Sequence, residues 1–156
     1  MSYRVGMGVD AHAFADSVPL VLGGVRFDWP RGLAGHSDGD VITHALIDAV
    51  LGAAGLGDIG SLFPSDDSTP EGVSSLELLR DALAQVRDAG YEVVNADCIL
   101  IGEQPRIGER RGELERMLTE VAGAPVSVRA TTTDKLGFTG RGEGLAAQAV
   151  ALVMQR

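Results

Sequence analysis

The chain has 156 residues, a length typical of one domain, and a chain of this size can bury roughly 68% of its unfolded surface. We therefore expect a single domain over residues 1–156, with no deep cleft between two domains. The 22 acidic and 13 basic residues give a net charge of −9, which excludes the basic field that nucleic acids and anionic membranes usually require. Cys98 is the single cysteine, which excludes an intrachain disulfide and a cysteine-cluster metal site.

The sequence also lacks the patterns that direct a chain to or across a membrane. Residues 1–10 do not show the charged and then apolar pattern of a signal peptide, and no stretch approaches the ~20 apolar residues of a membrane span. We therefore expect a cytoplasmic protein that binds neither membranes nor nucleic acids.

The first third of the chain predicts a strand, a hairpin and a helix. Alternating apolar residues predict a strand over residues 4–10, and apolar residues around a Gly-Gly pair predict a hairpin or bent strand over 19–27. Residues 30–35 are predicted to form a loop. Helical spacing of apolar residues predicts a helix over 37–54, where Ser37 stands three residues before an aspartate and forms a capping pair with it.

The middle of the chain predicts a long loop, a helix and a buried strand. Residues 55–72 are rich in Gly, Ser, Asp and Pro, and irregular segments of this length are usually functional or mobile. A helix is predicted from Ser74, whose side chain forms a capping box with Glu77, to Gly90 as its C-cap. Residues 93–101 form a nearly continuous apolar strand.

The last third predicts a helix over residues 109–122 that ends at Gly123, a strand over 126–133, a Gly-rich loop over 137–144 and a final helix from 145 to about 155. This order of elements predicts an α/β (α+β) fold, with a small mixed four-stranded sheet, a short hairpin and helices on one face of the sheet.

Two short motifs suggest activities that their surroundings do not favour. Residues 6–11 match the loose dinucleotide-binding fingerprint, but their glycines lie inside the predicted strand and Pro19 arrives before any helix. Residues 35–39 match the Gly-x-Ser-x-Gly elbow of serine hydrolases, which needs a strand directly before the serine. His44 lies seven residues on in the same helix and cannot easily reach Ser37, so we favour helix capping for Ser37 and keep the hydrolase as an alternative.

Three side chains form a candidate metal site. Asp10 and His12 are two residues apart and point to the same face if the first strand continues, and His44 on the following helix offers a third ligand. An oxygen-nitrogen set of three suits Zn²⁺ and leaves a fourth position for water or substrate. Asp40 and Asp48 share a helix stripe with His44, which predicts either that one of them orients its ring or that they form a solvated acidic face. A packed histidine without a metal is the alternative for His44.

The second candidate site is the Thr-rich and Gly-rich stretch over residues 131–144. Three threonines, Asp134, Lys135 and several glycines follow a predicted strand and precede a predicted helix, a composition typical of turns whose free N–H groups hold phosphate. An ordinary tight strand-to-helix loop is the alternative. The sequence lacks the Gly-Lys-Ser/Thr of a Walker-type phosphate loop.

Taken together, these motifs resemble the 2-C-methyl-D-erythritol 2,4-cyclodiphosphate synthase family. The resemblance runs the whole chain, in the family's order, and matches the length of the stand-alone enzymes. It is carried by residues 8–12, 35–41, 44–45, 57–60 with 62–64, and 131–144.

The resemblance implies a lyase of non-mevalonate isoprenoid synthesis. In this family, 4-diphosphocytidyl-2-C-methyl-D-erythritol 2-phosphate closes to the 2,4-cyclodiphosphate and releases CMP by intramolecular phosphoryl transfer. The resemblance implies one Zn²⁺ per subunit on Asp10, His12 and His44, and a Mg²⁺ or Mn²⁺ near Asp134 that bridges the substrate diphosphate. Two cations would let a chain of charge −9 accept an anionic nucleotide.

The resemblance also implies roles for further residues. His36, Thr132 and Asp134 would be catalytic, and the substrate would contact Asp10, His12, His36, Ser37, Asp58, Ile59, Gly60, Phe63, Asp67, Gly102, Pro105, Arg106, Thr131, Thr132, Thr133, Asp134, Phe138 and Arg141. Residues 102–108 together with the threonines would form the cytosine pocket. The implied assembly is a homotrimer with its sheets toward the centre and its active sites between neighbours. Phe138 and Arg141 would stand at the mouth of a central cavity that can hold an isoprenoid diphosphate.

Several positions depart from the family pattern. Asp134 stands where a glutamate is expected, which shortens the reach to the second metal by one methylene, and Arg106 replaces the usual lysine. Glu71 replaces a common lysine in a varied loop, so Ser65 and Asp67 are weaker candidates than Asp58. These departures leave a non-enzymatic isoprenoid-binding module as a further alternative.

Overall fold

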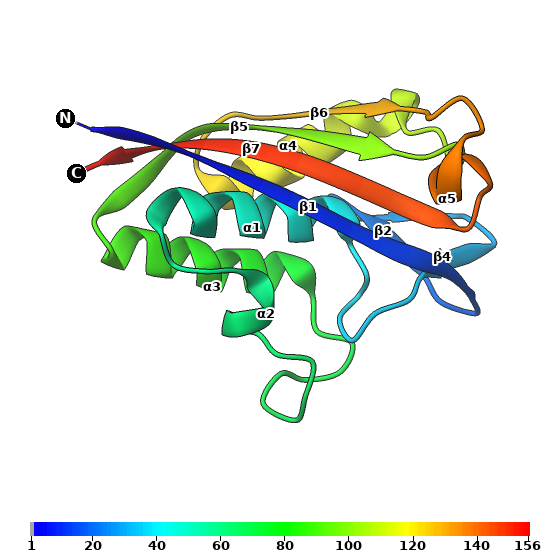
Figure 1. Cartoon of the computed structure of the whole chain (residues 1–156), viewed down its shortest axis with the longest axis horizontal. Helices are drawn as coiled ribbons and strands as arrows, with labels where there is room; N and C mark the ends of the chain where they lie inside the picture. The colour runs from blue at the N-terminus through cyan, green and yellow to red at the C-terminus, as the bar shows by residue number, and fades with distance from the viewer. Residues whose placement is uncertain (1) are drawn as a thin grey trace.

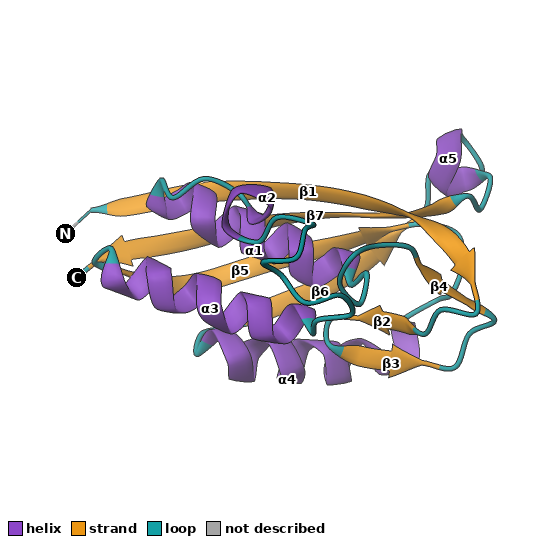
Figure 2. Cartoon of the chain, turned by 90° about the horizontal axis from the view of Figure 1, so that it is seen from below, coloured by secondary structure: helices purple, strands orange, loops and turns teal. Residues whose placement is uncertain are grey.

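The computed structural model describes residues 2–156. Within that range a five-stranded sheet has the strand order β4-β1-β7-β5-β6, and its helices cover one face (Figures 1 and 2). β1 runs antiparallel to β4 and β7, β5 runs antiparallel to β7, and β5 and β6 are parallel. In sheet order the strands are Arg31–Leu33 (β4), Tyr3–Asp16 (β1), Gly144–Gln155 (β7), Tyr91–Ile101 (β5) and Val126–Thr131 (β6).

Four strands come first along the chain, three helices follow, and strands and helices alternate only after that. The helices are Val41–Ala54 (α1), Ile59–Leu62 (α2), Ser75–Asp88 (α3), Arg111–Ala122 (α4) after a 3₁₀ turn at Gly108–Arg110, and Gly137–Gly140 (α5). Leu20–Leu22 (β2) and Val25–Phe27 (β3) pair as the predicted hairpin. No helix among these residues is long and apolar enough to cross a membrane.

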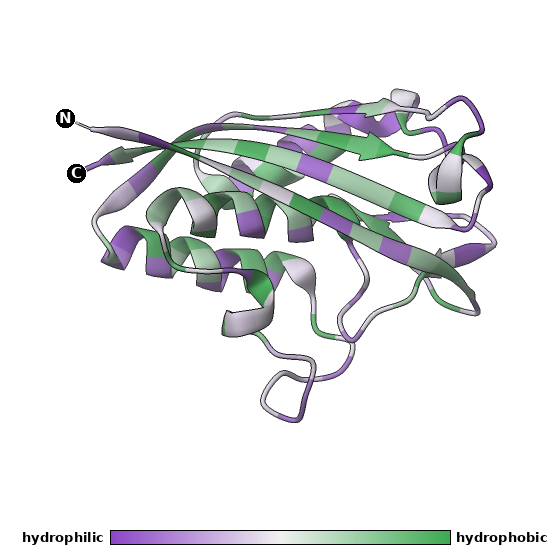
Figure 3. Ribbon diagram, in the orientation of Figure 1, coloured by the Kyte–Doolittle hydropathy of each residue, from purple (hydrophilic) through white to green (hydrophobic). Residues whose placement is uncertain are grey.

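The predicted final helix is wrong, because residues 144–155 form β7 at the centre of the sheet. The segment is rich in alanine, which favours helix in isolation, but its burial alternates with the period of a strand. Ala147, Ala149 and Ala151 are buried toward the helices, and most of the strand lies on the hydrophobic side of the scale in Figure 3. With β7 and with β4, which lies in the predicted loop, the sheet has five strands rather than four.

Glycines on β1 allow α1 to pack directly on the strand backbone. A Cβ on Gly8 would lie 1.9 Å from the carbonyl oxygen of Ala45, and one on Gly6 would lie 2.0 Å from that of Ala49. Real side chains do not tolerate such distances. The glycines of the dinucleotide-like motif are therefore packing positions inside a strand, and they bring α1 close to Asp10 and His12.

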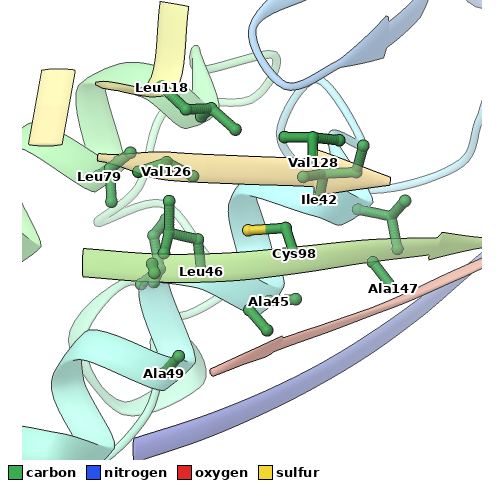
Figure 4. Close-up of a cluster of buried hydrophobic side chains, with 14 of the residues drawn as sticks. Ile42, Ala45, Leu46, Ala49, Leu79, Cys98, Leu118, Val126, Val128 and Ala147 are labelled. Atoms are coloured by element: carbon green, nitrogen blue, oxygen red, sulfur yellow. The ribbon is translucent and has the colours of Figure 1, made fainter. Parts of the chain in front are cut away.

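The core fills the space between the sheet and its helices (Figure 4). Ile42 and Leu46 of α1, Leu79 of α3 and Leu118 of α4 are almost completely buried there. Cys98 of β5 lies among them, and burial raises the pKa of its thiol to about 12. Its role is therefore packing rather than thiol chemistry.

The opposite face of the sheet carries exposed apolar side chains. Val5, Met7 and Val9 of β1 and Val150 of β7 are between 44% and 71% exposed. We call these four residues the open-face patch. A contiguous group of large apolar side chains on one sheet face is typical of an interaction surface.

Several helix ends differ from the predictions. α1 begins at Val41, and its N-cap is Asp40 rather than Ser37. The buried Asp40 carboxylate accepts hydrogen bonds from Thr43 and from the backbone N–H groups of Gly23 and Gly24 in the β2–β3 turn. One carboxylate thus begins the helix and ties the hairpin to it.

The predicted capping box of α3 does not form, because the Ser74 side chain makes no cap hydrogen bond. α3 ends one residue earlier than predicted, with Ala89 as its C-cap. α4 ends at Gly123 as predicted, whereas β6 stops at Thr131 and the predicted loops contain the short α2 and α5.

Candidate active site

The three predicted metal ligands meet at one point. Asp10 and His12 lie on β1 and point toward the helices, and His44 lies in the first turn of α1. The Asp10 Oδ2 atom is 2.7 Å from His12 Nε2 and 3.1 Å from His44 Nδ1, and the two ring nitrogens are 3.2 Å apart. The prediction that these residues are placed to bind a metal ion is confirmed.

The chemistry of this group fits a cation. Burial raises the pKa of Asp10, but hydrogen bonds and charge attraction from His12 and His44 outweigh burial and lower it to about 2. The hydrogen bond with Asp10 raises the pKa of His12, against the opposing effect of burial. The site therefore offers one carboxylate and two imidazoles, the ligand types that Zn²⁺ takes in catalytic sites with an open fourth position.

Two serines hold the other side of the His44 ring. His44 Nε2 is 2.9 Å from Ser37 Oγ and 2.9 Å from Ser75 Oγ. Ser75 is in turn bound to Asp38 through both its hydroxyl and its backbone N–H. Sequence reasoning missed Asp38 and Ser75 as parts of the site, because no spacing signal marks a serine on a different helix.

The prediction that Asp40 or Asp48 orients His44 is wrong. Asp40 is fully buried at the start of α1, and the Asp48 carboxylate accepts the Ile59 N–H at 2.8 Å. Neither side chain hydrogen-bonds to His44 in the described part of the chain. Neither belongs to a solvated face, because Asp40 is fully buried and Asp48 is half-buried.

A small pocket of about 160 Å³, which we call the metal pocket, opens beside the three ligands. His36 enters it from the loop after β4, and its Nε2 lies 2.6 Å from the Thr69 carbonyl oxygen. The pocket collects eight of the predicted site residues: Asp10, His12, His36, Ser37, His44, Ile59, Gly60 and Phe63. The predicted Asp58 and Asp67 do not line it. Asp58 instead caps α2 by accepting the Ser61 N–H at 2.8 Å.

The expectation that His44 cannot reach Ser37 is wrong. Gly39 has a φ of +75°, and this left-handed turn folds Ser37 back over the first turn of α1. Ser37, His44 and Asp10 consequently line up in the order of a Ser-His-Asp triad. His12, however, approaches the same carboxylate oxygen at 2.7 Å, which is the convergence expected of metal ligands and not of a triad.

A second pocket, of about 220 Å³, lies between the end of β5 and the end of β6. Eight residues of the predicted cytosine pocket line it: Gly102, Glu103, Pro105, Arg106, Ile107, Gly108, Thr131 and Thr132. Thr133 does not, because its hydroxyl donates to the Leu136 carbonyl at 2.7 Å and lies 2.9 Å from the Thr139 hydroxyl. We call this the β5–β6 pocket.

The turn after β6 is tight and exposed. Asp134 and Lys135 have φ values of +52° and +66°, and the Asp134 carboxylate projects among exposed residues. The Lys135 N–H donates to Glu103 at 2.9 Å, which ties the turn to the β5–β6 pocket. An exposed carboxylate on such a turn is available to a ligand-bound cation.

Phe138 and Arg141 lie farther along the same segment. Phe138 is 44% exposed, and Arg141 pairs with Glu143 at 2.8 Å. Arg141 lines a groove of about 510 Å³ together with Arg31, Arg106 and Lys135. This groove is distinct from the pocket of the metal ligands, with which it shares no lining residue.

Comparison with known proteins gives a consistent result. The model of the YgbB family matches residues 3–154. A 2-C-methyl-D-erythritol 2,4-cyclodiphosphate synthase from Erwinia tasmaniensis is 50% identical over 155 residues, covering 97% of this chain and 99% of the relative.

Solved structures agree. The bifunctional IspDF from Campylobacter jejuni superimposes with a TM-score of 0.95 and 39% identity, over 99% of this chain and 43% of that longer chain. A structure described as a CDP complex of IspF from Plasmodium falciparum has a TM-score of 0.85 and 30% identity, over 99% of this chain and 97% of that one. The chain therefore belongs to the YgbB family of 2-C-methyl-D-erythritol 2,4-cyclodiphosphate synthases.

Proposed function

We propose that this chain is a lyase that converts 4-diphosphocytidyl-2-C-methyl-D-erythritol 2-phosphate to 2-C-methyl-D-erythritol 2,4-cyclodiphosphate and CMP, in non-mevalonate isoprenoid synthesis. The observation that carries the proposal is the convergence of Asp10, His12 and His44 beside a pocket. It occurs in a chain whose relatives carry the synthase name over nearly their full length. Relatives described as bound to CDP support a cytidine diphosphate ligand.

The reaction moves one phosphoryl group within the substrate. An oxygen of the 2-phosphate attacks the β-phosphorus and forms a P–O bond, while the bond from the β-phosphorus to the bridging oxygen breaks and its electron pair leaves on CMP. Zinc on Asp10, His12 and His44, with Mg²⁺ or Mn²⁺ near Asp134, would offset the negative charge of the diphosphate. The remaining task of the protein is to position the reacting groups.

The residues of the metal pocket are proposed to hold the methylerythritol phosphate. His36 and Ser37 would orient the attacking phosphate, and the 2.6 Å approach of His36 Nε2 to the Thr69 carbonyl supports a fixed ring direction. Ile59, Gly60 and Phe63 would contact the carbon chain, with Asp58 and Asp67 outside the pocket at the hydroxyl groups.

The residues of the β5–β6 pocket are proposed to hold the cytosine. Gly102, Pro105, Arg106 and residues 131–133 would bind the base and its neighbouring groups, largely through the backbone. Thr132 and Asp134 would act on the diphosphate in the transition state.

We further propose a homotrimer with active sites between subunits. The open-face patch supports an interface that turns the sheets toward the centre, because it exposes Val5 and Met7 by 68% and 71%. The metal pocket and the β5–β6 pocket share no lining residue, which supports completion of each site by a neighbouring copy.

We also propose a central ligand site, a cellular location and a single domain. Phe138 and Arg141 would contact an isoprenoid diphosphate at the mouth of the central cavity. The chain would act in the cytoplasm. Residues 1–156 would form one synthase domain, of which Met1 lies outside the described residues.

A direct assay tests the proposed activity. Purified protein with Zn²⁺ and Mg²⁺ should convert the diphosphocytidyl substrate to equal amounts of CMP and cyclodiphosphate, and should contain one zinc per chain. Absence of CMP in a sample that holds zinc would contradict the proposed reaction. Tight binding of isoprenoid diphosphate without turnover would instead support the non-enzymatic module.

The serine hydrolase is a second candidate, because Ser37 Oγ lies 2.9 Å from His44 Nε2. A fluorophosphonate probe should label Ser37 of the metal-free protein if this pair is nucleophilic. We expect no labelling, and labelling of Ser37 would support the hydrolase.

A further inference from the structure

We propose that Asp38 and Ser75 are positioning residues for the metal site. They hold the His44 ring with its proton on Nε2, so that Nδ1 faces Asp10 and His12 as an unprotonated ligand. The proposal deepens the metal binding described under the proposed function and rests on it. It adds two residues from outside the ligand set, one on the loop after β4 and one on α3.

The first step concerns the hydroxyl proton of Ser75. Ser75 is fully buried, and its Oγ makes a short hydrogen bond with Asp38 Oδ1 while its backbone N–H donates to Asp38 Oδ2 at 3.0 Å. An ionised carboxylate can only accept hydrogen bonds, and a hydroxyl has one proton to donate. The Ser75 proton is therefore directed at Asp38.

The second step concerns the ring of His44. Because the Ser75 proton is engaged, Ser75 Oγ can only accept from His44 Nε2, which lies 2.9 Å away. A neutral imidazole carries one N–H, so a proton on Nε2 leaves the lone pair on Nδ1. Nδ1 is the atom that faces Asp10 Oδ2 at 3.1 Å and His12 Nε2 at 3.2 Å.

Ser37 does not set the tautomer in this way, although its Oγ is equally close to Nε2. Its oxygen accepts a long hydrogen bond of 3.3 Å from the Gly39 N–H, and in the described chain no carboxylate takes its proton. Ser37 can accept from Nε2 or donate to it. The direction of the network is therefore fixed by Asp38 through Ser75.

Backbone bonds keep this pair in register with the pocket. The Asp38 N–H donates to the Val73 carbonyl at 3.1 Å, and the Gly72 N–H donates to the His36 carbonyl at 2.7 Å. The segment before α3 is thus joined to the segment that carries His36. The segment that carries Asp38 therefore orients a metal ligand, and its His36 lines the metal pocket.

Two substitutions separate this role from simple support of α3. Ser75→Ala removes the hydroxyl but keeps the backbone N–H bond to Asp38, so the helix start is preserved. Asp38→Asn replaces one accepting carboxylate oxygen by an amide donor, so one of its two bonds to Ser75 is lost. Ser74→Ala is the matched control, because the Ser74 side chain makes no cap hydrogen bond.

The test measures zinc affinity and the tautomer separately. In metal-free protein at about pH 9, ¹⁵N shifts of the wild-type His44 ring should show the proton on Nε2, in spite of the Asp10 carboxylate 3.1 Å from Nδ1. Ser75→Ala should give a mixture of tautomers. Zinc affinity, measured by competition with a chelator, should fall about 10- to 100-fold in Ser75→Ala and at least as far in Asp38→Asn. Ser74→Ala should leave both unchanged.

The outcomes distinguish this inference from the proposed function. If wild-type protein binds no zinc, the proposed metal site fails, while the ¹⁵N shifts still report the tautomer. If wild-type protein binds zinc and Ser75→Ala matches it in affinity and tautomer, the inference is overturned. Circular dichroism checks folding, and Ser75→Ala decides the question if Asp38→Asn does not fold.

Discussion

The metal pocket and the β5–β6 pocket are built in opposite ways. The metal pocket uses side chains from β1, α1 and the loop after β4, and its ligand His44 is 7% exposed, with Nδ1 3.1 Å from Asp10 and Nε2 2.9 Å from Ser75. The β5–β6 pocket is formed by loop backbone and by exposed side chains such as Thr132. The difference indicates that one chain preorganises the metal pocket, which we call the metal half of the proposed site. We expect the β5–β6 pocket, the proposed nucleotide half, to be completed by a ligand or a neighbouring copy.

The largest expected effect comes from removing His44, a ligand of the metal half. His44→Ala leaves two ligands, which rarely hold a catalytic metal, and turnover should fall at least about 1,000-fold with loss of zinc. CMP release and metal analysis measure the two effects. Glu120→Ala, an exposed position on α4, is the control. Retention of zinc by His44→Ala would show that the ligand assignment is incorrect.

The close packing of α1 on β1 can be broken without touching a ligand. Gly8→Val places a Cβ 1.9 Å from the Ala45 carbonyl oxygen, so α1 must shift, and the free energy of unfolding should drop by about 3 kcal/mol. Zinc affinity should weaken as well, because His44 moves with the helix. Urea unfolding and chelator competition test this. Gly52→Ala on the same helix meets only the Met7 carbonyl at 3.9 Å, and should be neutral or slightly stabilising.

A mixing experiment asks whether the two halves come from different chains. His44→Ala lacks the metal half and Asp134→Ala lacks the nucleotide half, so each variant alone should be nearly inactive. In mixed trimers refolded from equal amounts, each site draws its two halves independently, and about a quarter of the wild-type activity should return. If both halves of a site come from one chain, the mixture stays inactive. Refolded wild-type protein supplies the reference activity.

The smallest expected effect concerns the exposed carboxylate of the nucleotide half. Asp134→Glu adds the methylene that the family resemblance leads us to expect at this position. The Mg²⁺ concentration for half-maximal turnover should decrease a few-fold, roughly 1 kcal/mol or less by the usual conversion. A metal titration of turnover measures it, with zinc content as the unchanged control. An increase in the Mg²⁺ requirement would argue that the shorter side chain already fits.

The metal ligands could be predicted because histidine is rare in this chain and, with aspartate, belongs to the usual metal-ligand types. Asp10 and His12 are two residues apart on a strand, and the first helical turn carries the third ligand. Asp38 and Ser75 were missed because aspartate and serine are common residue types, and only the packing of α3 against the loop after β4 brings these two together. The nearness of Ser37 to His44 was missed because it depends on one left-handed residue, Gly39.

The prediction was correct for the three long helices α1, α3 and α4 and wrong for the central strand β7. β7 is rich in alanine, and alanine favours helix in isolated peptides. In the folded chain small side chains are required there, because β7 lies between β1 and β5 with α1 packed across it. Tertiary packing therefore overrides the local preference.

The central place of β7 also constrains how the protein can be made. β1 pairs with β7 from Tyr3 to Ala13, so the earliest strand to leave the ribosome has its main partner among residues 144–155. A nascent chain that lacks these residues leaves the β7 edge of β1 unpaired, and unpaired strand edges promote aggregation. The sheet is therefore complete only once residues 144–155 have been synthesised.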